Sequence, residues 1–276
     1  MEKNIGLIAG NGNLPIVITK AAKSQGYRVY ICAINGEASE SLSNIADNVE
    51  WVALGQLSKL AKFFKRFHVS NVMMAGKVTK TNLFKGEVKP DLEMVKLIAK
   101  IRDRKDDTLL GAVTNYLESN GIHVLSSVSF LSAELPEKGI LTKQKPNNED
   151  YEEIEFGWKI AKQIAGLDIG QIVVTKKKAV IAVEAIEGTD RAILRASELA
   201  SKGTNVFKVA KPSQDMRFDV PTVGLTTLDS MIRAGVRMLV IEAKKTILLD
   251  REEFFKKANQ QKMIVVAWED DGKKGR

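Results

Sequence analysis

The run NIGLIAGNGNLPIVITKAAKSQGYRVYICAI, residues 4–34, decides the fold class of the first part of the chain. It begins with a short apolar run, Asn4–Ala9, and breaks at GNGNLP. The apolar residues of IVITKAAKSQ then recur with the 3.6-residue spacing of a helix, which Gly26 would end. A second apolar run, YRVYICAI, follows as a strand. Strand, turn, helix and strand joined by short links are typical of a parallel sheet flanked by helices.

The same alternation continues along the first half of the chain. VEWVAL and NVMMAG read as strands on either side of the amphipathic helix LSKLAKFFKRF. Helical patterns over 92–101 and 108–120 and a strand at IHVLSS extend the layer. We therefore predict an N-terminal Rossmann-like α/β domain with a parallel sheet over residues 1–140.

The segment LPEKGILTKQKPNNEDYEE interrupts this pattern because it is rich in Pro, Asn, Lys and Glu. We place a domain boundary in it, near Pro146, and predict a second α/β domain over 146–276. There, IVVT and AVIAVEA are separated by three lysines, a link too short for a parallel crossover, so they read as an antiparallel hairpin. Further strands, such as VFKVAK and VRMLVIEA, alternate with helices. The second domain is therefore expected to have a mixed sheet.

The charge balance favours an anionic partner. The chain has 42 Lys and Arg against 34 Asp and Glu, a net charge of +8, which suits nucleic acid, a phosphorylated ligand or an anionic membrane surface. The densest basic clusters, 176–178 and 273–274, lack interleaved aromatic residues. Nucleic acid is therefore disfavoured as the partner.

Other features narrow the location and the chemistry. No apolar run approaches the roughly 18 residues of a membrane-spanning helix, and the N-terminus lacks a signal-peptide core, so we expect a cytoplasmic protein. Cys32 lies in the apolar run VYICAI and is expected to be a buried small hydrophobe. His68 and His123 have no partner residues nearby in the sequence. A histidine triad or a zinc site is therefore disfavoured, and any catalysis has to rest on carboxylates, metal, Lys and Arg.

The loop Gly10–Pro15 joins the first strand to the first helix, where backbone N–H groups at a helix N-terminus can hold phosphate. Pro15 replaces the third glycine of the dinucleotide fingerprint, and the second strand leads to Asn35 instead of an acid that would hold a ribose. A nicotinamide cofactor is therefore disfavoured. A tight strand-to-helix turn with proline in the first helical turn is the alternative interpretation.

The stretch AVEAIEGTD gathers Glu184, Glu187 and Asp190 where a strand ends and a helix begins. Thr189 suits the N-cap and Asp190 the first turn, where it complements the helix dipole. Capping does not account for the two glutamates. Carboxylates beside a helix N-terminus suit Mg²⁺ or Mn²⁺, which take oxygen ligands and often bridge to phosphate.

A second polar loop, KPSQDMRFDVPTVG, lies between the strand VFKVAK and the helix TTLDSMIRAG. Its two prolines predict a shaped, non-helical loop, and loops mounted on rigid elements often carry sites. A surface loop with satisfied charges is the alternative. Because the two acidic loops follow neighbouring strands of one sheet, we expect them to face a common cleft.

Seven segments together suggest a family: IGLIAGNGNLP, VMMAGKV, DDTLLGAV, LDIGQIVV, AVEAIEGTD, KPSQDMRFDVPTVGLTT and AGVRMLVIEAKKTILLD. In this order, over nearly the whole chain, they resemble the metal-dependent UDP-2,3-diacylglucosamine pyrophosphatases of lipid A biosynthesis. The resemblance implies hydrolysis of the pyrophosphate of UDP-2,3-diacylglucosamine to UMP and 2,3-diacylglucosamine 1-phosphate (lipid X). It also implies Mg²⁺ or Mn²⁺ as cofactor, two domains with a substrate cleft between them, and a homodimer.

The resemblance, together with the loop chemistry, also suggests the site residues. The expected catalytic residues are Asp219, Asp190 and Glu187. The expected metal ligands are Asp219, Asp190, Glu184 and Asp215. The expected substrate-binding residues are Gly10, Gly12, Asn13, Gly76, Lys77, Gly188, Thr189, Lys211, Gln214 and Arg217. The basic surface suggests peripheral contact with the anionic inner membrane.

Two rival functions keep parts of this pattern. A non-enzymatic regulator that binds a nucleotide or sugar nucleotide would keep the glycine loop but need no acid cluster. A sugar-nucleotide oxidoreductase is disfavoured by the defects in the dinucleotide fingerprint. In the first loop, Asn11 stands where the family resemblance leads us to expect a further glycine, which weakens the interpretation of this loop as a phosphate wrap.

Overall fold

The computed structural model describes residues 3–78, 89–100, 106–218 and 220–270, and its contacts divide the chain into two compact units. The first unit comprises Met1–Leu131 together with the short segment Asp215–Asp219. The second comprises Ser132–Gln214 and Val220–Arg276. Asp215–Asp219 therefore packs with the first unit, although its neighbours in sequence belong to the second.

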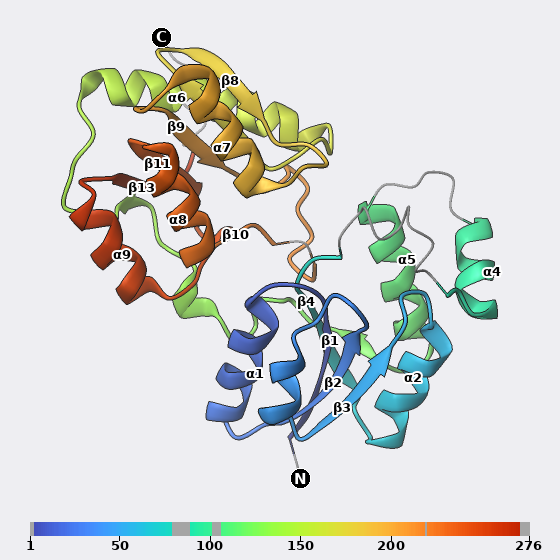
Figure 1. The fold of residues 1–276 in the computed structure, drawn as a ribbon. Coiled ribbons are helices and arrows are strands. Elements are labelled where there is room, and N and C mark those ends of the chain that lie inside the picture. Colours follow the sequence, from blue (N-terminus) through green and yellow to red (C-terminus); the bar gives the residue numbers. More distant parts are fainter. Residues whose placement is uncertain (1–2, 79–88, 101–105, 219, 271–276) are drawn as a thin grey trace. The chain divides into compact units, whose positions relative to one another are not determined.

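The first unit is built on a parallel sheet with the strand order β3-β2-β1-β4-β5, shown in Figure 1. This confirms the predicted Rossmann-like parallel sheet. Its elements are β1 (Asn4–Ala9), α1 (Leu14–Ser24), β2 (Arg28–Ile34), the 3₁₀ turn η1 (Glu40–Asn44), β3 (Asn48–Val52), α2 (Leu57–Arg66), β4 (Asn71–Ala75), α4 (Leu92–Lys100), α5 (Asp106–Ser119) and β5 (His123–Val124).

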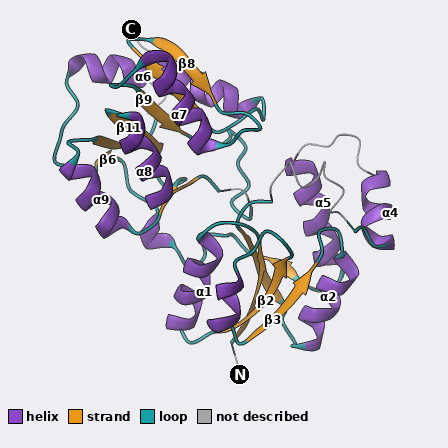
Figure 2. Cartoon of the chain, viewed as in Figure 1, coloured by secondary structure: helices purple, strands orange, loops and turns teal. Residues whose placement is uncertain are grey.

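Helices cover both faces of this sheet, with α1 on one side and α2 and α5 on the other (Figure 2). On the α2 side, Phe63, Phe64 and Leu117 are buried against Ile8 and Met74 of the strands. β1, β2 and β4 are buried along nearly their whole length and so supply both faces, because successive side chains of a strand point to opposite sides.

Cys32 is fully buried in this core, as the sequence predicted, and burial raises the pKa of its thiol. A thiol in such surroundings stays protonated and unreactive.

The second unit is built on a six-stranded mixed sheet with the order β6-β13-β11-β9-β7-β8. The predicted hairpin is confirmed, since β7 and β8 pair antiparallel. The elements are η2 (Ser132–Glu134), β6 (Gly139–Ile140), α6 (Asn148–Gly166), β7 (Ile172–Lys176), β8 (Ala179–Val183), α7 (Thr189–Ala200), β9 (Asn205–Lys208), β10 (Thr222–Val223), α8 (Leu225–Ala234), β11 (Met238–Glu242), β12 (Ile247–Leu248), α9 (Arg251–Gln260) and β13 (Ile264–Trp268).

The strand directions bring several loops to one edge of this sheet. β9, β11 and β13 are parallel to one another, and β7 runs antiparallel to both β9 and β8. The carboxyl ends of β8, β9 and β11 therefore lie at the same edge as the beginning of β7. α6 packs on one face of the sheet, and α7, α8 and α9 pack on the other.

The contacts assign residues 132–140 to the second unit, whereas composition led us to place the boundary near Pro146. The reason lies in β6, which pairs antiparallel with β13 through Ile140 and Val266. A two-residue strand carries too little pattern to be found in the sequence.

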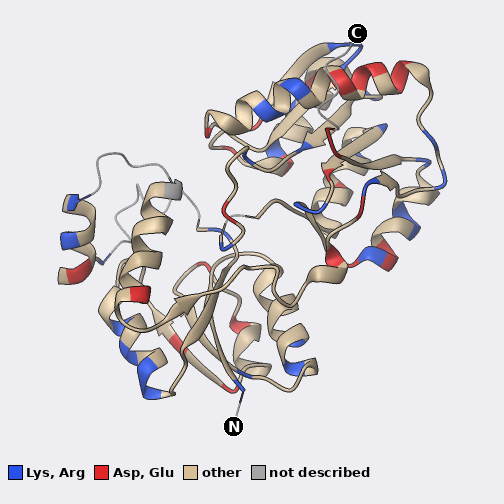
Figure 3. Ribbon diagram, turned by 180° about the vertical axis from the view of Figure 1, so that it is seen from behind, with Lys and Arg blue, Asp and Glu red and all other residues tan. Residues whose placement is uncertain are grey.

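Basic side chains are spread over both units, with a run along α2 (Figure 3). That helix contributes Lys59, Lys62, Lys65 and Arg66, on the side away from its buried residues. Among the described residues, no helix is both long and apolar enough to cross a membrane.

Asp150 connects the start of α6 to the start of β11. It closes a capping box with Asn147 and accepts hydrogen bonds from both terminal nitrogens of Arg237. Burial alone would raise the pKa of Asp150, but the Arg237 and Asn147 hydrogen bonds outweigh it and lower the pKa.

Asp150→Asn is expected to lower the free energy of unfolding by roughly 1–2 kcal/mol at neutral pH, because Arg237 is partly solvated and the ion pair is screened. Since the folded pKa is depressed, this stabilisation is present above the unfolded pKa of about 3.9 and is lost as the pH falls through the folded value. Urea unfolding of the wild type and Asp150→Asn across pH 2–7 should therefore show a difference in the free energy of unfolding that disappears in acid. A difference that is the same at every pH would contradict the stabilising role of the Asp150 charge. Asp229→Asn, at an exposed pair with Lys257, serves as the control.

Candidate functional site

The carboxyl edge of the second sheet gathers charged side chains from several strands. Glu184 follows β8, Thr189 and Asp190 open α7, Lys208 ends β9, and Glu242 ends β11. Charged groups at such an edge are well placed for a ligand, since the loops beyond the strands are free to vary in shape.

Glu184, Thr189 and Lys208 form a buried chain of hydrogen bonds at this edge. The Thr189 hydroxyl donates to Oε1 of Glu184 at 2.8 Å, and Nζ of Lys208 donates to the Thr189 hydroxyl at 3.2 Å. The other oxygen of Glu184 accepts from the backbone N–H of Gln171 at 3.1 Å. All three members of the chain are buried, and Lys208 is 3% exposed. The carboxylate and the ammonium therefore offset each other's burial through the hydroxyl between them.

Our expectation that Thr189 is the N-cap of α7 is wrong. Gly188 takes the cap position with a φ of 85°, a left-handed value that favours glycine, and Thr189 is the first helical residue. The Thr189 hydroxyl donates to Glu184 instead of accepting from the first turn of the helix.

The acids of AVEAIEGTD have different surroundings. Oδ1 of Asp190 is buried and has no hydrogen-bond partner within the described part of the chain. Glu187 accepts from Arg195 at 2.7 Å and from the backbone N–H of Ala185 at 3.1 Å. Burial raises the pKa of Glu187, but hydrogen bonds from its own backbone N–H, from Arg195 and from Ala185 outweigh it and the net shift is downward.

Across residues 3–78, 89–100, 106–218 and 220–270, no three Asp, Glu, His or Cys side chains are grouped as metal ligands.

Lys211 lies just beyond β9 and is held at the same edge. Its ammonium group is 2.7 Å from the carboxylate of Asp168, and its side chain is 7% exposed. Gln214 turns back so that its side-chain oxygen accepts from the Lys211 backbone N–H at 3.3 Å. The predicted residues Glu184, Thr189, Asp190 and Lys211 thus belong to one edge of one sheet.

Two charged residues of this edge escaped the sequence interpretation. Glu242 accepts from Nζ of Lys162 at 2.9 Å and from the backbone N–H of Ala210 at 2.9 Å, which fastens the loop after β9 to the end of β11. Lys208 is the other. Each is the last residue of an apolar strand, Lys208 in VFK and Glu242 in VIE. A charged residue at the carboxyl end of an apolar strand is the signal that would have identified them.

Gly170 allows the loop before β7 to lie against the backbone of Glu184. A Cβ atom on Gly170 would come within 2.1 Å of the Glu184 carbonyl oxygen, a distance that real Cβ atoms do not show. Only glycine therefore fits at position 170 without moving the backbone of Glu184, whose side chain accepts the hydrogen bond from Gln171.

Gly170→Ala is expected to lower turnover at least about tenfold and stability by roughly 1–3 kcal/mol, because the added methyl displaces the Glu184 backbone. Gly166→Ala is the matched control, since its methyl would lie 3.5 Å from Pro212, an ordinary contact. Rates and thermal unfolding of the two variants give the comparison. Equal behaviour of the two would contradict the role given to Gly170.

The segment Asp215–Asp219 carries the other predicted residues and packs in the first unit. Asp215 accepts from Nε of Arg217 at 3.0 Å and from its terminal nitrogen at 2.7 Å, and Arg217 also reaches Glu118 at 3.3 Å. The hydrogen bond from Arg217 lowers the pKa of Asp215. Arg217 is thus held by two carboxylates. Asp219 lies outside the described residues.

Two serines hold this segment to the first unit. The backbone N–H of Ser127 and the hydroxyl of Ser126 both donate to the Met216 carbonyl, at 2.8 and 3.0 Å. Phe218 is 4% exposed and belongs to the core cluster that contains Phe63 and Met74. β5 is shorter than the predicted strand IHVLSS, and the backbone N–H of Ser127 donates to Met216 of this segment instead of continuing the ladder with β4.

The glycine loop of the first unit packs against the loop after β4. The backbones of Asn11 and Lys77 pair with each other at 2.7 and 2.9 Å, and a Cβ atom on Gly10 would lie 2.6 Å from the Lys77 carbonyl oxygen. Gly76 has a φ of 88° and its Cβ would meet the backbone of Gly10 at 2.6 Å. Close backbone approach is thus a structural reason for both glycines.

Gly12 and Asn13 lie at the start of α1. Gly12 has a φ of 101° with open space around it, and Asn13 precedes the helix without a side-chain cap hydrogen bond. Substrate binding by Gly10, Gly12, Asn13, Gly76 and Lys77 stays a prediction.

Comparison with known proteins places both units in one family. Residues 4–133 match the LpxI N-terminal domain, and residues 137–266 match the LpxI C-terminal domain. The chain is 30% identical over 277 residues to the UDP-2,3-diacylglucosamine pyrophosphatase LpxI of Caulobacter vibrioides, covering 96% of this chain and 97% of that protein. The chain belongs to the LpxI family. Membership of the LpxI family confirms the resemblance found in the sequence.

Solved structures show weaker likeness than this LpxI relative. A glycinamide transformylase from Mycobacterium tuberculosis is 11% identical with a TM-score of 0.25, over 66% of this chain and 44% of that chain. An N5-carboxyaminoimidazole synthetase from Staphylococcus aureus is 12% identical with a TM-score of 0.24, over 64% of this chain and 39% of that chain. The chain thus spans less than half the length of either structure, and scores this low say nothing about function.

Proposed function

We propose that this protein hydrolyses the pyrophosphate bond of UDP-2,3-diacylglucosamine to 2,3-diacylglucosamine 1-phosphate (lipid X) and UMP, in lipid A biosynthesis. The observation that carries the proposal is the similarity to the Caulobacter protein, which extends over 97% of that protein's length and whose name states this activity. The non-enzymatic regulator is less well supported, because it gives no role to the acids and lysines gathered at the edge of the second sheet.

The charges at that edge suit a cation. Lys208 is matched by Glu184 through Thr189, and Lys211 is matched by Asp168. Asp190 then adds negative charge, with an oxygen that is buried and has no hydrogen-bond partner in the described part of the chain. A buried oxygen of this kind fits a hard divalent cation, which prefers carboxylate ligands.

We propose Mg²⁺ or Mn²⁺ as the cofactor, with Asp190 as one of its ligands. When bound, the cation would neutralise pyrophosphate oxygens and lower the pKa of water. The oxygens of Glu184 and Asp215 are engaged by Thr189, Gln171 and Arg217. We therefore assign Glu184 and Asp215 to positioning, since their hydrogen bonds set the loops that carry the other groups.

The proposed reaction is attack by water on the β-phosphorus, the one bonded to the sugar. The bond from the water oxygen to that phosphorus forms as the bond to the bridging oxygen breaks, and UMP leaves with that oxygen. The family resemblance favours Asp219, which lies outside the described residues, as the group that takes the proton from water. Lys211, whose ammonium group is positioned by Asp168, would donate hydrogen bonds to the phosphoryl oxygens.

Incubation of the purified protein with UDP-2,3-diacylglucosamine in ¹⁸O-water tests both the activity and the phosphorus attacked. We expect UMP to appear with added Mg²⁺ or Mn²⁺, its release to stop with a chelator, and the label to enter lipid X. Mass spectrometry of both products decides the outcome. Label in UMP would show that water attacks the α-phosphorus instead. Undiminished turnover with chelator would contradict the need for a cation. Absence of UMP would contradict the proposed function.

We also propose that the protein acts in the cytoplasm, in peripheral contact with the inner membrane, and as a homodimer. The net charge of +8 supports attraction to anionic headgroups, and the dimer rests on the family resemblance. Flotation with vesicles of anionic and neutral lipid, and sedimentation equilibrium, measure the two properties separately.

A further inference from the structure

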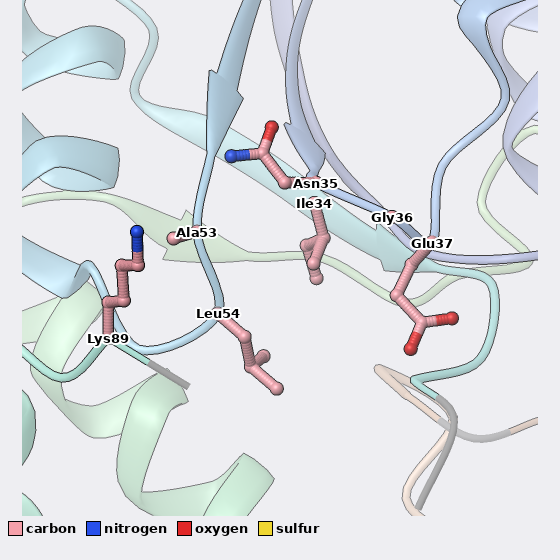
Figure 4. A pocket seen from close by; sticks show the side chains of 7 residues that line it. All are labelled: Ile34, Asn35, Gly36, Glu37, Ala53, Leu54 and Lys89. Carbon is pink, nitrogen blue, oxygen red and sulfur yellow. The ribbon is translucent and has the colours of Figure 1, made fainter. Parts of the chain in front are cut away.

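The loops that follow β2 and β9 are held in different ways. In the first unit, β2 ends beside a hollow of about 260 Å³ (Figure 4), and Asn35, the residue after the strand, donates its backbone N–H to the Val52 carbonyl at 2.9 Å. In the second unit, Ala210 lies two residues beyond β9, and side chains bond both of its backbone polar groups. The path of the loop after β9 therefore depends on the identity of those side chains.

Lys162 and Glu242 are the two side chains that hold Ala210, and we call them the Ala210 clamp. The Ala210 N–H donates to Oε2 of Glu242 at 2.9 Å, and the Ala210 carbonyl accepts from Nζ of Lys162 at 2.7 Å. Nζ of Lys162 also donates to both oxygens of Glu242, at 2.9 and 3.1 Å. The lysine, the carboxylate and Ala210 thus close a ring of hydrogen bonds.

The members of the clamp are fixed by the elements that carry them. Glu242 is the last residue of β11 and is buried, and Lys162 lies on α6 with its Nζ 5.8 Å from the centre of the Trp158 ring. The ion pair and the Ala210 N–H offset the cost of burying the Glu242 carboxylate. Apolar residues of similar volume often stabilise a core as well as a buried ion pair does. The pair therefore points to a role other than stability.

Lys211 follows the clamp directly. Its ammonium group is 2.7 Å from the carboxylate of Asp168, which comes just after the end of α6. α6 therefore holds this loop twice, at Ala210 through Lys162 and at Lys211 through Asp168. The direction of the Lys211 side chain is thus set by α6 and by the end of β11.

We propose that Lys162 and Glu242 are positioning residues for the reaction, because the clamp fixes Lys211 in the direction in which its ammonium group meets a phosphoryl oxygen. The proposal rests on the proposed function for the phosphate that Lys211 holds. A displacement of about 1 Å at a group that orients a substrate can cost roughly 100-fold in rate. Lys162 and Glu242 act on the substrate only through Lys211.

A double-mutant cycle between Lys162 and Lys211 tests the clamp in the full-length protein. Lys162→Met keeps the aliphatic stem beside Trp158 and removes the donor to the Ala210 carbonyl, so kcat/KM for UDP-2,3-diacylglucosamine should fall about tenfold. In a Lys211→Ala background, the same change should lower kcat/KM less than twofold further, because the residue through which it acts is gone. The midpoint of thermal unfolding should fall in both backgrounds.

Three further variants separate positioning from a general loss of structure. Lys162→Arg keeps the charge and the donors, and it should lose less than threefold in kcat/KM. Lys245→Met is the matched control and should stay within twofold, since Lys245 reaches Oε1 of Glu242 at 3.1 Å, whereas the Ala210 N–H donates to Oε2. Should Lys162→Met fail to fold, Glu242→Gln takes its place in the cycle, with an expected loss of about fivefold only while Lys211 is present.

Calorimetric binding of inorganic pyrophosphate separates this proposal from the proposed function. Lys162→Met should weaken pyrophosphate binding about fivefold when Lys211 is present and less than twofold when it is replaced by alanine. This pattern in a protein that releases no UMP would support the clamp and overturn the proposed function.

Losses that multiply fully in the double variant would overturn the clamp alone, as would a Lys162→Met protein with wild-type kcat/KM. If the wild type turns over the substrate but binds no pyrophosphate, the cycle in kcat/KM decides. A wild type with neither turnover nor pyrophosphate binding would overturn both proposals.

Discussion

Asp190→Asn is expected to lower kcat for UMP release at least about 100-fold, while the second unit remains folded. The change keeps the shape of the side chain and removes the negative charge of an oxygen that is buried without a hydrogen-bond partner among the described residues. Loss of a charge that holds a catalytic cation removes stabilisation of the transition state. Steady-state rates with saturating Mg²⁺ or Mn²⁺, together with circular dichroism of the variant, measure the effect.

Variants of three other acids make this test specific. Asp219→Ala should cause a loss of similar size, whereas Glu187→Gln should cause a smaller one, because Glu187 is engaged by Arg195. Asp229→Asn is the control, since this exposed acid of α8 pairs with Lys257, and it should keep the rate within twofold. An Asp190→Asn protein with wild-type kcat would exclude Asp190 from the site.

Phe218→Ala is expected to lower the free energy of unfolding of the first unit by about 3–5 kcal/mol, the usual cost of removing a buried phenyl ring. Phe218 is 4% exposed and comes from the short segment that packs with the first unit. Its removal leaves the segment attached through polar contacts, chiefly those of Ser126 and Ser127 to Met216. Turnover should therefore fall as well, because the loosened segment carries Arg217 and Asp219.

Hydrogen exchange in residues 120–131 and 214–220, with urea unfolding, measures both consequences. Faster exchange of the Ser127 amide in Phe218→Ala would show that the segment opens from the first unit. Phe218→Leu retains most of the apolar volume and should lose about 1 kcal/mol. Identical unfolding curves for the wild type and the alanine variant would contradict the anchoring role.

The elements of both units were readable from the sequence because their signals are local. Apolar runs bounded by Gly and Pro identified β1 and β2, and a three-lysine link was enough to identify the antiparallel hairpin of β7 and β8. A mixed sheet in the second half followed from that hairpin. The family resemblance rested on segments such as AVEAIEGTD, and the match to the LpxI relative confirms the family. All these signals depend on residues within one element or one loop.

The tertiary structure alone decided which distant residues meet. Nothing local in KPSQDMRFDVPTVG shows that Phe218 is buried in the core of the first unit, because that position depends on Ser126 and Ser127, about 90 residues earlier. Likewise, Lys208 reads as part of an apolar strand until the pairing of β9 with β7 brings it beside Thr189 and Glu184. Periodicity records which face of an element is apolar, but the partner of a polar side chain is set by contacts between elements, which local sequence does not encode.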